Sequence, residues 1–248
     1  MGGKNGLRKL AASEPFRAKE TIADLSQSGL GMHNKRKGPQ SATRALLLET
    51  ASAIMRDGDI VDVSLAELSQ RSGLNSALVK YHFGNKAGLL SALLDRDWRA
   101  IVESVDALVA RDGWSPEDKL RRHISRVVDT FYAVPYLNQL TMRMVRDSDE
   151  AEARRIAESY LSPLYRAYED LIGQGVATGA FRPVDPQLFY FTLTGAVDRF
   201  FSARLVLRHC FGQDTLTEDL RDRYREHTID VVMAGILARD GTGKGTGE

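Results

Sequence analysis

The sequence predicts an all-α fold of about nine helices, with a small three-helix unit near the N-terminus and a larger helical region behind it. Three observations support this class. Apolar residues recur at three- and four-residue spacing through most of residues 43–240, and no segment shows the strict alternation of a half-buried strand. Glycine or proline separates the apolar stretches from one another.

The composition is that of an ordinary soluble globular protein. Of 248 residues, 43% are hydrophobic and 27% are charged, and no apolar run approaches the roughly 20 residues that a membrane span needs. The N-terminus has no apolar core like that of a secretory signal. Cys210 is the only cysteine, so no internal disulfide can form. We therefore expect a cytoplasmic protein with no membrane partner.

The charge is unevenly distributed along the chain. Residues 1–44 hold five Lys and four Arg against three acidic residues, a net of +6, whereas the whole chain carries only +1. A basic end on a mildly acidic body is typical of nucleic-acid binders. Residues 1–42 have few large apolar side chains and are predicted to form a flexible basic arm. The glycine-rich residues 241–248 are predicted to form a disordered tail.

Helical periodicity and end signals divide the rest of the chain. Gly58 ends the first predicted helix, and Gly179 follows the seventh, in which Pro163 should produce a kink. Ser115 and Asp185 are each followed by a proline, as at the start of a capped helix. The predicted helices cover about residues 43–57, a short pair within 64–83, and 86–111, 115–134, 136–146, 149–177, 185–209 and 217–239.

Residues 64–90 carry the most specific pattern, which is a short helix, a glycine turn, a second short helix and the start of a third. Ser64 and Glu67 have the spacing of a capping box, which places the start of the first helix. Gly73 can adopt the left-handed conformation that a sharp turn between helices needs. Asn75 is expected to cap the second helix. This order is that of a helix-turn-helix motif, in which the second helix reads DNA.

The second helix of this motif is predicted to present one face to DNA. Val79 points inward, whereas Ser76 is placed to contact a base or a phosphate, and Leu78 a thymine methyl group. The basic and aromatic side chains that follow are better suited to phosphate oxygens. The predicted DNA contacts are Thr43, Arg44, Ser64, Asn75, Ser76, Ala77, Leu78, Lys80, Tyr81, His82 and Lys86.

A resemblance to a known family rests on residues 81–90, which read Tyr-His-Phe-Gly-Asn-Lys-Ala-Gly-Leu-Leu. This run resembles the signature of the tetracycline-repressor (TetR) family of bacterial transcription regulators. The resemblance extends over about residues 43–95, and beyond them only the helical architecture agrees. The chain departs from the family pattern at Asp59, where an aromatic residue is common, and also at Ala77, Leu78 and Lys80. These departures concern the operator sequence and not the mode of binding.

The resemblance implies that the fourth to seventh predicted helices enclose a pocket for a small-molecule effector and that the eighth and ninth form a homodimer. The last predicted helix is apolar on more than one face, which exceeds what packing on one side requires. The predicted pocket residues are Trp98, Phe131, Tyr132, Met142, Arg143, Arg146, Tyr165 and Tyr168. The predicted dimer contacts are Phe189, Thr192, Ala196, Phe200, Ala203, Tyr224, Thr228, Val231, Val232 and Gly235. The alternative is that these side chains complete the core of a monomer.

These observations predict a transcription regulator, most simply a repressor, that binds a palindromic DNA operator and is released by its effector. The predicted domains are residues 43–90 for DNA binding and 91–240 for effector binding and dimerisation. An activator or corepressor-dependent regulator of the same fold is the alternative, followed by a helical adaptor that does not bind DNA. No catalytic motif is present, and His209 and Cys210 lack the further cysteines of a metal site. No enzyme activity, cofactor or metal is therefore expected.

Overall fold

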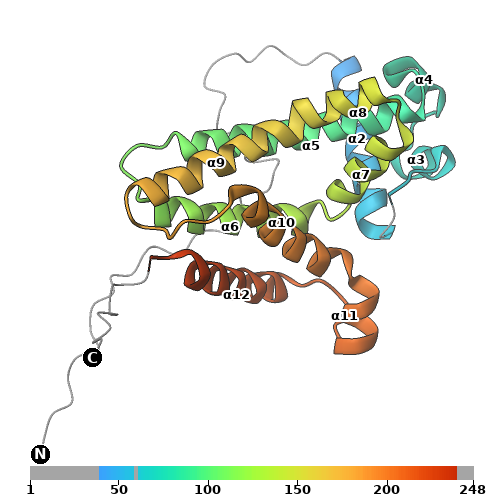
Figure 1. The fold of residues 1–248 in the computed structure, drawn as a ribbon. Helices are drawn as coiled ribbons and strands as arrows, with labels where there is room; N and C mark the ends of the chain where they lie inside the picture. The colour runs from blue at the N-terminus through green and yellow to red at the C-terminus, as the bar shows by residue number, and fades with distance from the viewer. Residues whose placement is uncertain (1–38, 59–60, 239–248) are drawn as a thin grey trace, which may run out of the picture.

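The structure is a computed structural model that describes residues 39–58 and 61–238 (Figure 1). Every element assigned within these residues is helical, which confirms the predicted all-α class. The strand-like feature in this part of the chain is a single bridge between Phe181 and Leu237. The predicted tail, residues 241–248, and residues 1–38 of the predicted arm lie outside the described residues.

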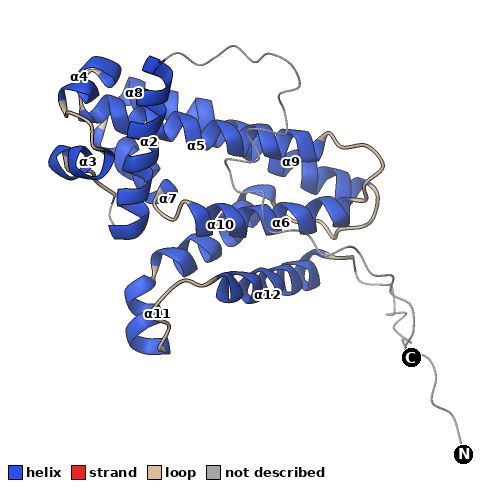
Figure 2. Ribbon diagram, turned by 180° about the vertical axis from the view of Figure 1, so that it is seen from behind, coloured by secondary structure: helices blue, strands red, loops and turns tan. Residues whose placement is uncertain are grey.

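Four helices form the N-terminal end of the described chain. They are α2 (Pro39–Gly58), α3 (Leu65–Ser72), α4 (Ala77–Phe83) and the long α5 (Lys86–Val109). α2 begins before the predicted start near Thr43, at a proline whose fixed φ suits the first position of a helix. Figures 1 and 2 show α2, α3 and α4 gathered at one end of α5, whose other end runs into the body of the molecule.

The remaining helices build this body. They are α6 (Pro116–Ala133), α7 (Leu137–Asp147), α8 (Glu150–Ile156), α9 (Ser162–Ala177), α10 (Pro186–Ser202), α11 (Arg204–Phe211) and α12 (Glu218–Ile236). α9 packs against α5, α6 and α10, and α12 packs against α6. α11 projects from the body beyond the end of α10 (Figure 1). No helix within the described ranges is both long and apolar enough to cross a bilayer.

Pro163 alters the helix predicted over residues 149–177. A π-helical turn, Ala157–Leu161, joins α8 to α9, and the Ser162 N–H bonds to the carbonyl five residues earlier. Proline lacks an N–H, and its ring clashes with the carbonyl four residues before it. The wider turn accommodates that ring, so the chain continues as a helix with a local change of pitch.

The helix predicted over residues 185–209 is two helices. Asp185 caps α10 as predicted, because its carboxylate accepts from the backbone N–H groups of Gln187 and Leu188. At Ala203 the backbone leaves the helical region, with φ −92° and ψ 38°, and α11 begins after it. Alanine has the highest helix propensity of all residues, so no local signal predicts this break.

Two glycines of α9 differ in the space around them. A Cβ on Gly175 would overlap the ring of Phe181, which is buried, whereas a Cβ on Gly173 would meet nothing within 4 Å. The loop that follows α9 therefore packs directly on the helix at Gly175.

We expect Gly175→Ala to lower the free energy of unfolding by about 1–3 kcal/mol, because the added methyl group overpacks the contact with Phe181. Gly173→Ala is the matched control. It should raise the free energy of unfolding by up to about 1 kcal/mol, since alanine is the better helix former. Chemical denaturation measures both, and equal effects of the two substitutions would contradict the packing described.

Candidate functional site

The turn between α3 and α4 is fixed by hydrogen bonds of its own residues. Gly73 lies in the left-handed region at φ 69°, as predicted, and its N–H donates to the Ser69 carbonyl at 3.0 Å. The Asn75 Oδ1 atom accepts from the Ala77 N–H at 2.8 Å and so caps α4. These bonds hold the two short helices in one orientation relative to each other.

α4 buries one side and exposes the other. Val79 is 1% exposed, and Phe83 is half-buried with the guanidinium carbon of Arg44 5.1 Å from its ring centre. The opposite face carries four exposed residues, which are Ser76, Ala77, Lys80 and Tyr81. A short helix that is packed on one side and carries polar and aromatic groups on the other has the form of a DNA-reading helix.

The junction between α4 and α5 leaves no room for a side chain. Gly84 ends α4 at φ 78°, and Asn85 caps α5 by accepting from the Gly88 N–H at 2.8 Å. A Cβ on Gly88 would overlap the carbonyl oxygen of Phe83. The backbones of the two helices therefore touch, which fixes α4 at the start of the long α5.

The structure changes the predicted role of the Ser64–Glu67 pair and adds a partner for Lys86. Ser64 stands before α3, but its side chain makes no capping hydrogen bond, and Glu67 forms an ion pair with Arg71 at 2.9 Å. The predicted capping box is therefore absent. Lys86 forms an ion pair with Asp62 at 2.6 Å and is still 38% exposed.

The predicted DNA contacts lie together at this end of the molecule. They belong to α2, the residue before α3, the α3–α4 turn, α4 and the first turn of α5. The exposed members are Arg44, Ser64, Asn75, Ser76, Ala77, Lys80 and Tyr81, and the partly buried members are Thr43, Leu78, His82 and Lys86.

A buried group of three side chains, the Ser52–Tyr136–Asp97 cluster, connects α2 with α5 and α7. The Tyr136 hydroxyl donates to Asp97 Oδ2 at 2.8 Å and lies 2.7 Å from Ser52 Oγ, which therefore donates to it. Asp97 also pairs with Arg96 at 2.7 Å. Burial raises the pKa of Asp97, although the charge of Arg96 opposes the effect. Since all three members are 3% exposed or less, breaking these bonds leaves polar atoms unpaired in the interior.

A cavity of about 1020 Å³ lies in the body of the molecule. Most of its lining comes from α5, α6, α7, α9 and α10, and the start of α12 closes one edge. Six of the predicted pocket residues line it, which are Trp98, Phe131, Tyr132, Met142, Tyr165 and Tyr168.

Arg143 and Arg146 do not line this cavity, contrary to the prediction. Asn138 and Met142 occupy the face of α7 that meets the cavity, and the two arginines lie on other faces. Arg143 donates to the Val61 carbonyl at 2.9 Å, next to the start of α3, and Arg146 is exposed. α7 therefore contacts the cavity with one face and, with another, the end of the molecule that holds α2, α3 and α4.

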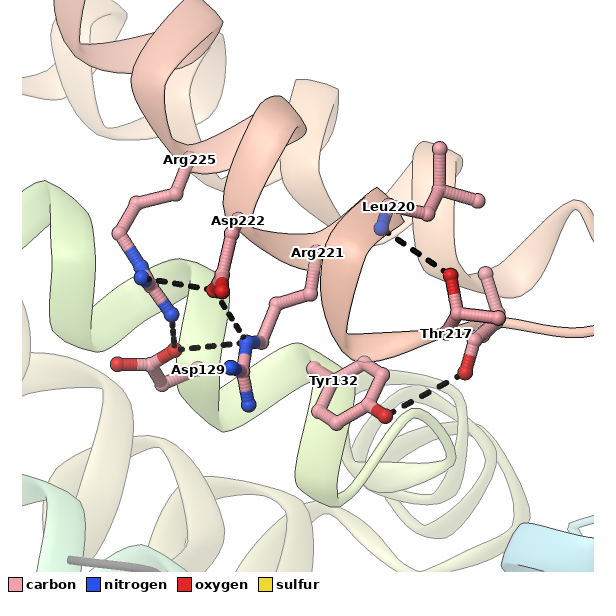
Figure 3. Close-up of polar contacts among 8 residues, drawn as sticks. Asp129, Tyr132, Thr217, Leu220, Arg221, Asp222 and Arg225 are labelled. Atoms are coloured by element: carbon pink, nitrogen blue, oxygen red, sulfur yellow. Dashed lines mark hydrogen bonds and ion pairs between the residues drawn. The ribbon is translucent and has the colours of Figure 1, made fainter. Parts of the chain in front are cut away.

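Charged side chains fix α12 against α6 at the edge of the cavity (Figure 3). Asp129 on α6 pairs with Arg225 and lies 3.7 Å from the Arg221 Nε atom. Asp222 pairs with both arginines at 2.9 Å. Burial raises the pKa of Asp222, but the hydrogen bond from Arg221 and both positive charges outweigh it and hold the pKa below its ordinary value. Asp129 is the member of this group that lies on α6, so its ion pairs with the two arginines join α12 to α6.

Several polar residues of the cavity were not predicted from the sequence. They are Arg122, His123, Arg126, Asn138, Thr194 and Arg225. Those on α6 recur at helical spacing, so the period places them on adjoining faces. The period alone does not tell which of these faces meets a cavity and which meets solvent or core.

The outer sides of α10, α11 and α12 expose large apolar side chains. We call this set the apolar outer face, and its members are Leu188, Phe191, Leu205, Val206, Phe211 and Val231. Leu188 and Phe191 are 66% and 63% exposed and lie one turn apart on α10. Exposed apolar patches of this kind mark association surfaces on soluble proteins. None of these residues except Val231 was among the predicted dimer contacts.

The predicted dimer contacts divide between exposed positions and positions that are partly or fully buried within one protomer. Exposed are Thr192, Ala196, Val231 and Gly235, and partly buried are Phe189, Phe200, Ala203, Tyr224 and Val232. Phe200 and Tyr224 stack with ring centres 3.7 Å apart, which joins α10 to α12 within one protomer. Thr228 is 5% exposed and donates to the Tyr224 carbonyl at 2.7 Å, so it faces the interior, contrary to the prediction.

Comparisons with known proteins agree with this architecture. Residues 113–242, more than half of the chain, match the family model described as tetracyclin repressor-like, C-terminal domain. A curated relative, the HTH-type transcriptional regulator BetI of Stenotrophomonas maltophilia (strain R551-3), is 28% identical over 109 residues, which are 44% of this chain and 54% of that protein. The match therefore spans about half the length of this relative.

Solved structures with the same fold cover most of the chain. The ketosteroid transcriptional regulator KstR2 of Mycobacterium tuberculosis gives a TM-score of 0.61 at 18% identity, covering 84% of this chain and 98% of that one. A TetR/AcrR-family regulator from Thermobifida fusca gives 0.58 at 21% identity, covering 78% and 98%. A regulatory protein of the tetR family from Rhodococcus RHA1 gives 0.57 at 16% identity, covering 82% and 100%.

Proposed function

Because the chain belongs to the TetR family of transcriptional regulators, which are not enzymes, we propose that it is a ligand-controlled repressor that binds a palindromic operator as a homodimer. The observation that carries the proposal is the exposed face of α4, which is packed on its other side and bounded by two glycine turns. The proposed domains are residues 43–90 for DNA binding and 91–240 for effector binding and dimerisation, with α5 passing from one to the other.

We infer that α4 enters the major groove with its N-terminal residues toward the base edges. Ser76 then contacts a base and Leu78 a thymine methyl group. Lys80 and Tyr81 lie farther along the helix and contact phosphates, which position the protein without reading the sequence. Lys86 reaches a phosphate by exchanging its ion pair with Asp62 for one with DNA.

Substitutions at this surface should separate residues that set the affinity for DNA of any sequence from residues that set the preferred operator sequence. Tyr81→Ala and Lys86→Ala should weaken binding to every DNA sequence, and Lys86→Ala should reduce the slope of log affinity against log salt by about 1. Ser76→Ala and Leu78→Ala should instead change the preferred operator, by about 1–3 kcal/mol at the base pair read. Gel shifts with genomic fragments selected by the parent protein, repeated at several salt concentrations, measure both effects.

Arg121→Ala is the matched control for loss of a positive charge, because Arg121 is exposed on α6, outside the predicted DNA contacts. Its DNA affinity and salt slope should equal those of the parent. If the four test variants also bind as the parent does, α4 is not the reading helix.

We further infer that the apolar outer face joins two protomers. A dimer makes the second DNA contact intramolecular, which raises the affinity for a palindrome above that of one reading helix. Half-sites one helical turn apart, about 34–36 Å, suit two copies of α4. The small exposed residues Thr192, Gly195 and Ala196 on α10 allow a partner helix to approach closely.

A charge on the apolar outer face should produce monomers. Phe191→Glu and Val231→Glu each place a carboxylate in the proposed interface, where burial without a partner is unfavourable. Sedimentation analysis should give the mass of one protomer for each variant. Leu46→Glu is the control, since Leu46 is 45% exposed on α2, and it should leave the dimer intact. A dimer that survives both test substitutions would exclude this face as the interface.

The proposed route from effector to DNA runs through α7. Asn138 and Met142 of this helix line the cavity, whereas Tyr136 at its start bonds to Ser52 of α2. An effector that displaces α7 therefore disturbs the DNA-binding end. By thermodynamic linkage, such an effector binds more tightly to the form of the protein that does not bind DNA.

A further inference from the structure

Two polar side chains of the cavity lining have no hydrogen-bond partner among the described residues. His123 on α6 and Tyr168 on α9 are each 1% exposed, and both line the cavity. The unpaired atoms are the two ring nitrogens of His123 and the Tyr168 hydroxyl. The two rings meet edge to face with centres 4.7 Å apart, so the two side chains form one corner of the cavity wall.

Both side chains are uncharged at neutral pH. Burial, supported by the positive charge of Arg126, lowers the pKa of His123 to about 4. Burial likewise raises the pKa of Tyr168 well above its ordinary value. A neutral imidazole has one donor and one acceptor nitrogen, and a phenol hydroxyl donates and accepts. The corner therefore offers donors and acceptors to an uncharged polar group of a ligand.

Leaving these atoms unpaired is unfavourable. Native proteins pair the great majority of their buried polar atoms, and an unpaired one carries its full desolvation penalty. A ligand oxygen that accepts from the N–H of His123 and from the Tyr168 hydroxyl removes the penalty of those two donors, and a ligand hydroxyl can also donate to an acceptor, whereas an apolar group at the same place does neither. The corner therefore selects ligands by a hydrogen bond and not by shape alone.

The rest of the lining indicates what surrounds that oxygen. Apolar and aromatic side chains, among them Trp98, Phe131 and Leu164, provide a surface for a hydrocarbon skeleton. Six arginines line the cavity, against the two carboxylates of Asp129 and Glu218, within the part of the chain that the structure describes. Asp222 also pairs with two of these arginines, Arg221 and Arg225, and the formal charge around the cavity is still positive, which favours an anionic ligand.

We propose that the cavity binds an amphipathic carboxylate whose apolar body carries a ketone or hydroxyl group, and that His123 and Tyr168 bind this oxygen. The carboxylate lies toward the arginines, and the hydrocarbon fills the space between. The inference rests on the proposed effector role of the cavity and specifies the class of its ligand.

Ligand binding can be measured without DNA, because Trp98 lines the cavity. The chain has two tryptophans, so in a Trp114→Phe background the fluorescence reports Trp98 alone. The ligands are dodecanoic acid and a fused-ring carboxylic acid of steroid size. Each acid is compared with its hydroxy and oxo derivatives, and a positional series of oxododecanoic acids places the ketone at different depths. The methyl esters of the same compounds remove the negative charge.

We expect at least one oxo or hydroxy acid to bind the parent about tenfold more tightly than its unsubstituted acid, and its methyl ester to bind more weakly. His123→Phe and Tyr168→Phe should each remove about 3- to 10-fold of this preference, the effect of one hydrogen bond, with no loss of affinity for the unsubstituted acid. In the absence of ligand, both variants should have a melting temperature equal to or higher than that of the parent. Tyr224→Phe is the control and should keep the preference, because Tyr224 lies outside the cavity lining and its hydroxyl donates to the Ala196 carbonyl at 2.9 Å.

Three results would overturn the proposal. They are equal affinity for substituted and unsubstituted acids, a preference that persists in both test variants, and no binding of any acid in the set. Equal affinity for an acid and its ester would refute the anionic part. DNA release is measured separately by gel shift. Binding with the expected preference but without DNA release would leave this inference intact and contradict the proposed effector function.

Discussion

The Ser52–Tyr136–Asp97 cluster is the contact on which the rest of the structure depends. It joins α2 of the DNA-binding end, the long α5 and the start of α7 through side chains that are almost fully buried. Buried polar groups tolerate few alternative arrangements, because each lost bond leaves an unpaired atom in a medium of low dielectric. The cavity and α4 share no residue, so any influence of a ligand on DNA binding passes through α2, α5 or α7, the three elements that the cluster joins.

The DNA-binding end could be predicted closely because its signals are local. The left-handed turn at Gly73 and the cap from Asn75 depend on the residue itself and its nearest neighbours, and the structure confirms both. The predicted capping box is absent, because Glu67 forms an ion pair with Arg71, four residues later, and not a hydrogen bond to the start of α3. The break between α10 and α11 at Ala203 could not be predicted in this way. Alanine favours a helix, and tertiary contacts can override that local preference.

The cavity and the outer face could be predicted only in part, because both are defined by how several helices pack. Spacing places Tyr168 in the interior, but it does not tell a filled core from a cavity. Arg143 was chosen for its charge, and its position on α7 directs it to the Val61 carbonyl. The exposure of Phe191 was not predicted, because α10 is apolar on two sides and spacing alone does not show which side lies outside.

Hydrogen exchange of the Tyr136→Phe variant tests the central claim most directly. The substitution keeps the ring and removes the hydroxyl that bonds to Ser52 and Asp97. Amide protection in α2 should fall by about 5- to 100-fold, equivalent to about 1–3 kcal/mol, while α9 keeps the protection of the parent. Tyr224→Phe, which removes a hydroxyl that donates to the Ala196 carbonyl of α10, should alter neither helix. Unchanged protection in α2, or an equal loss in α2 and α9, would contradict the claim that this cluster holds the DNA-binding end to the body.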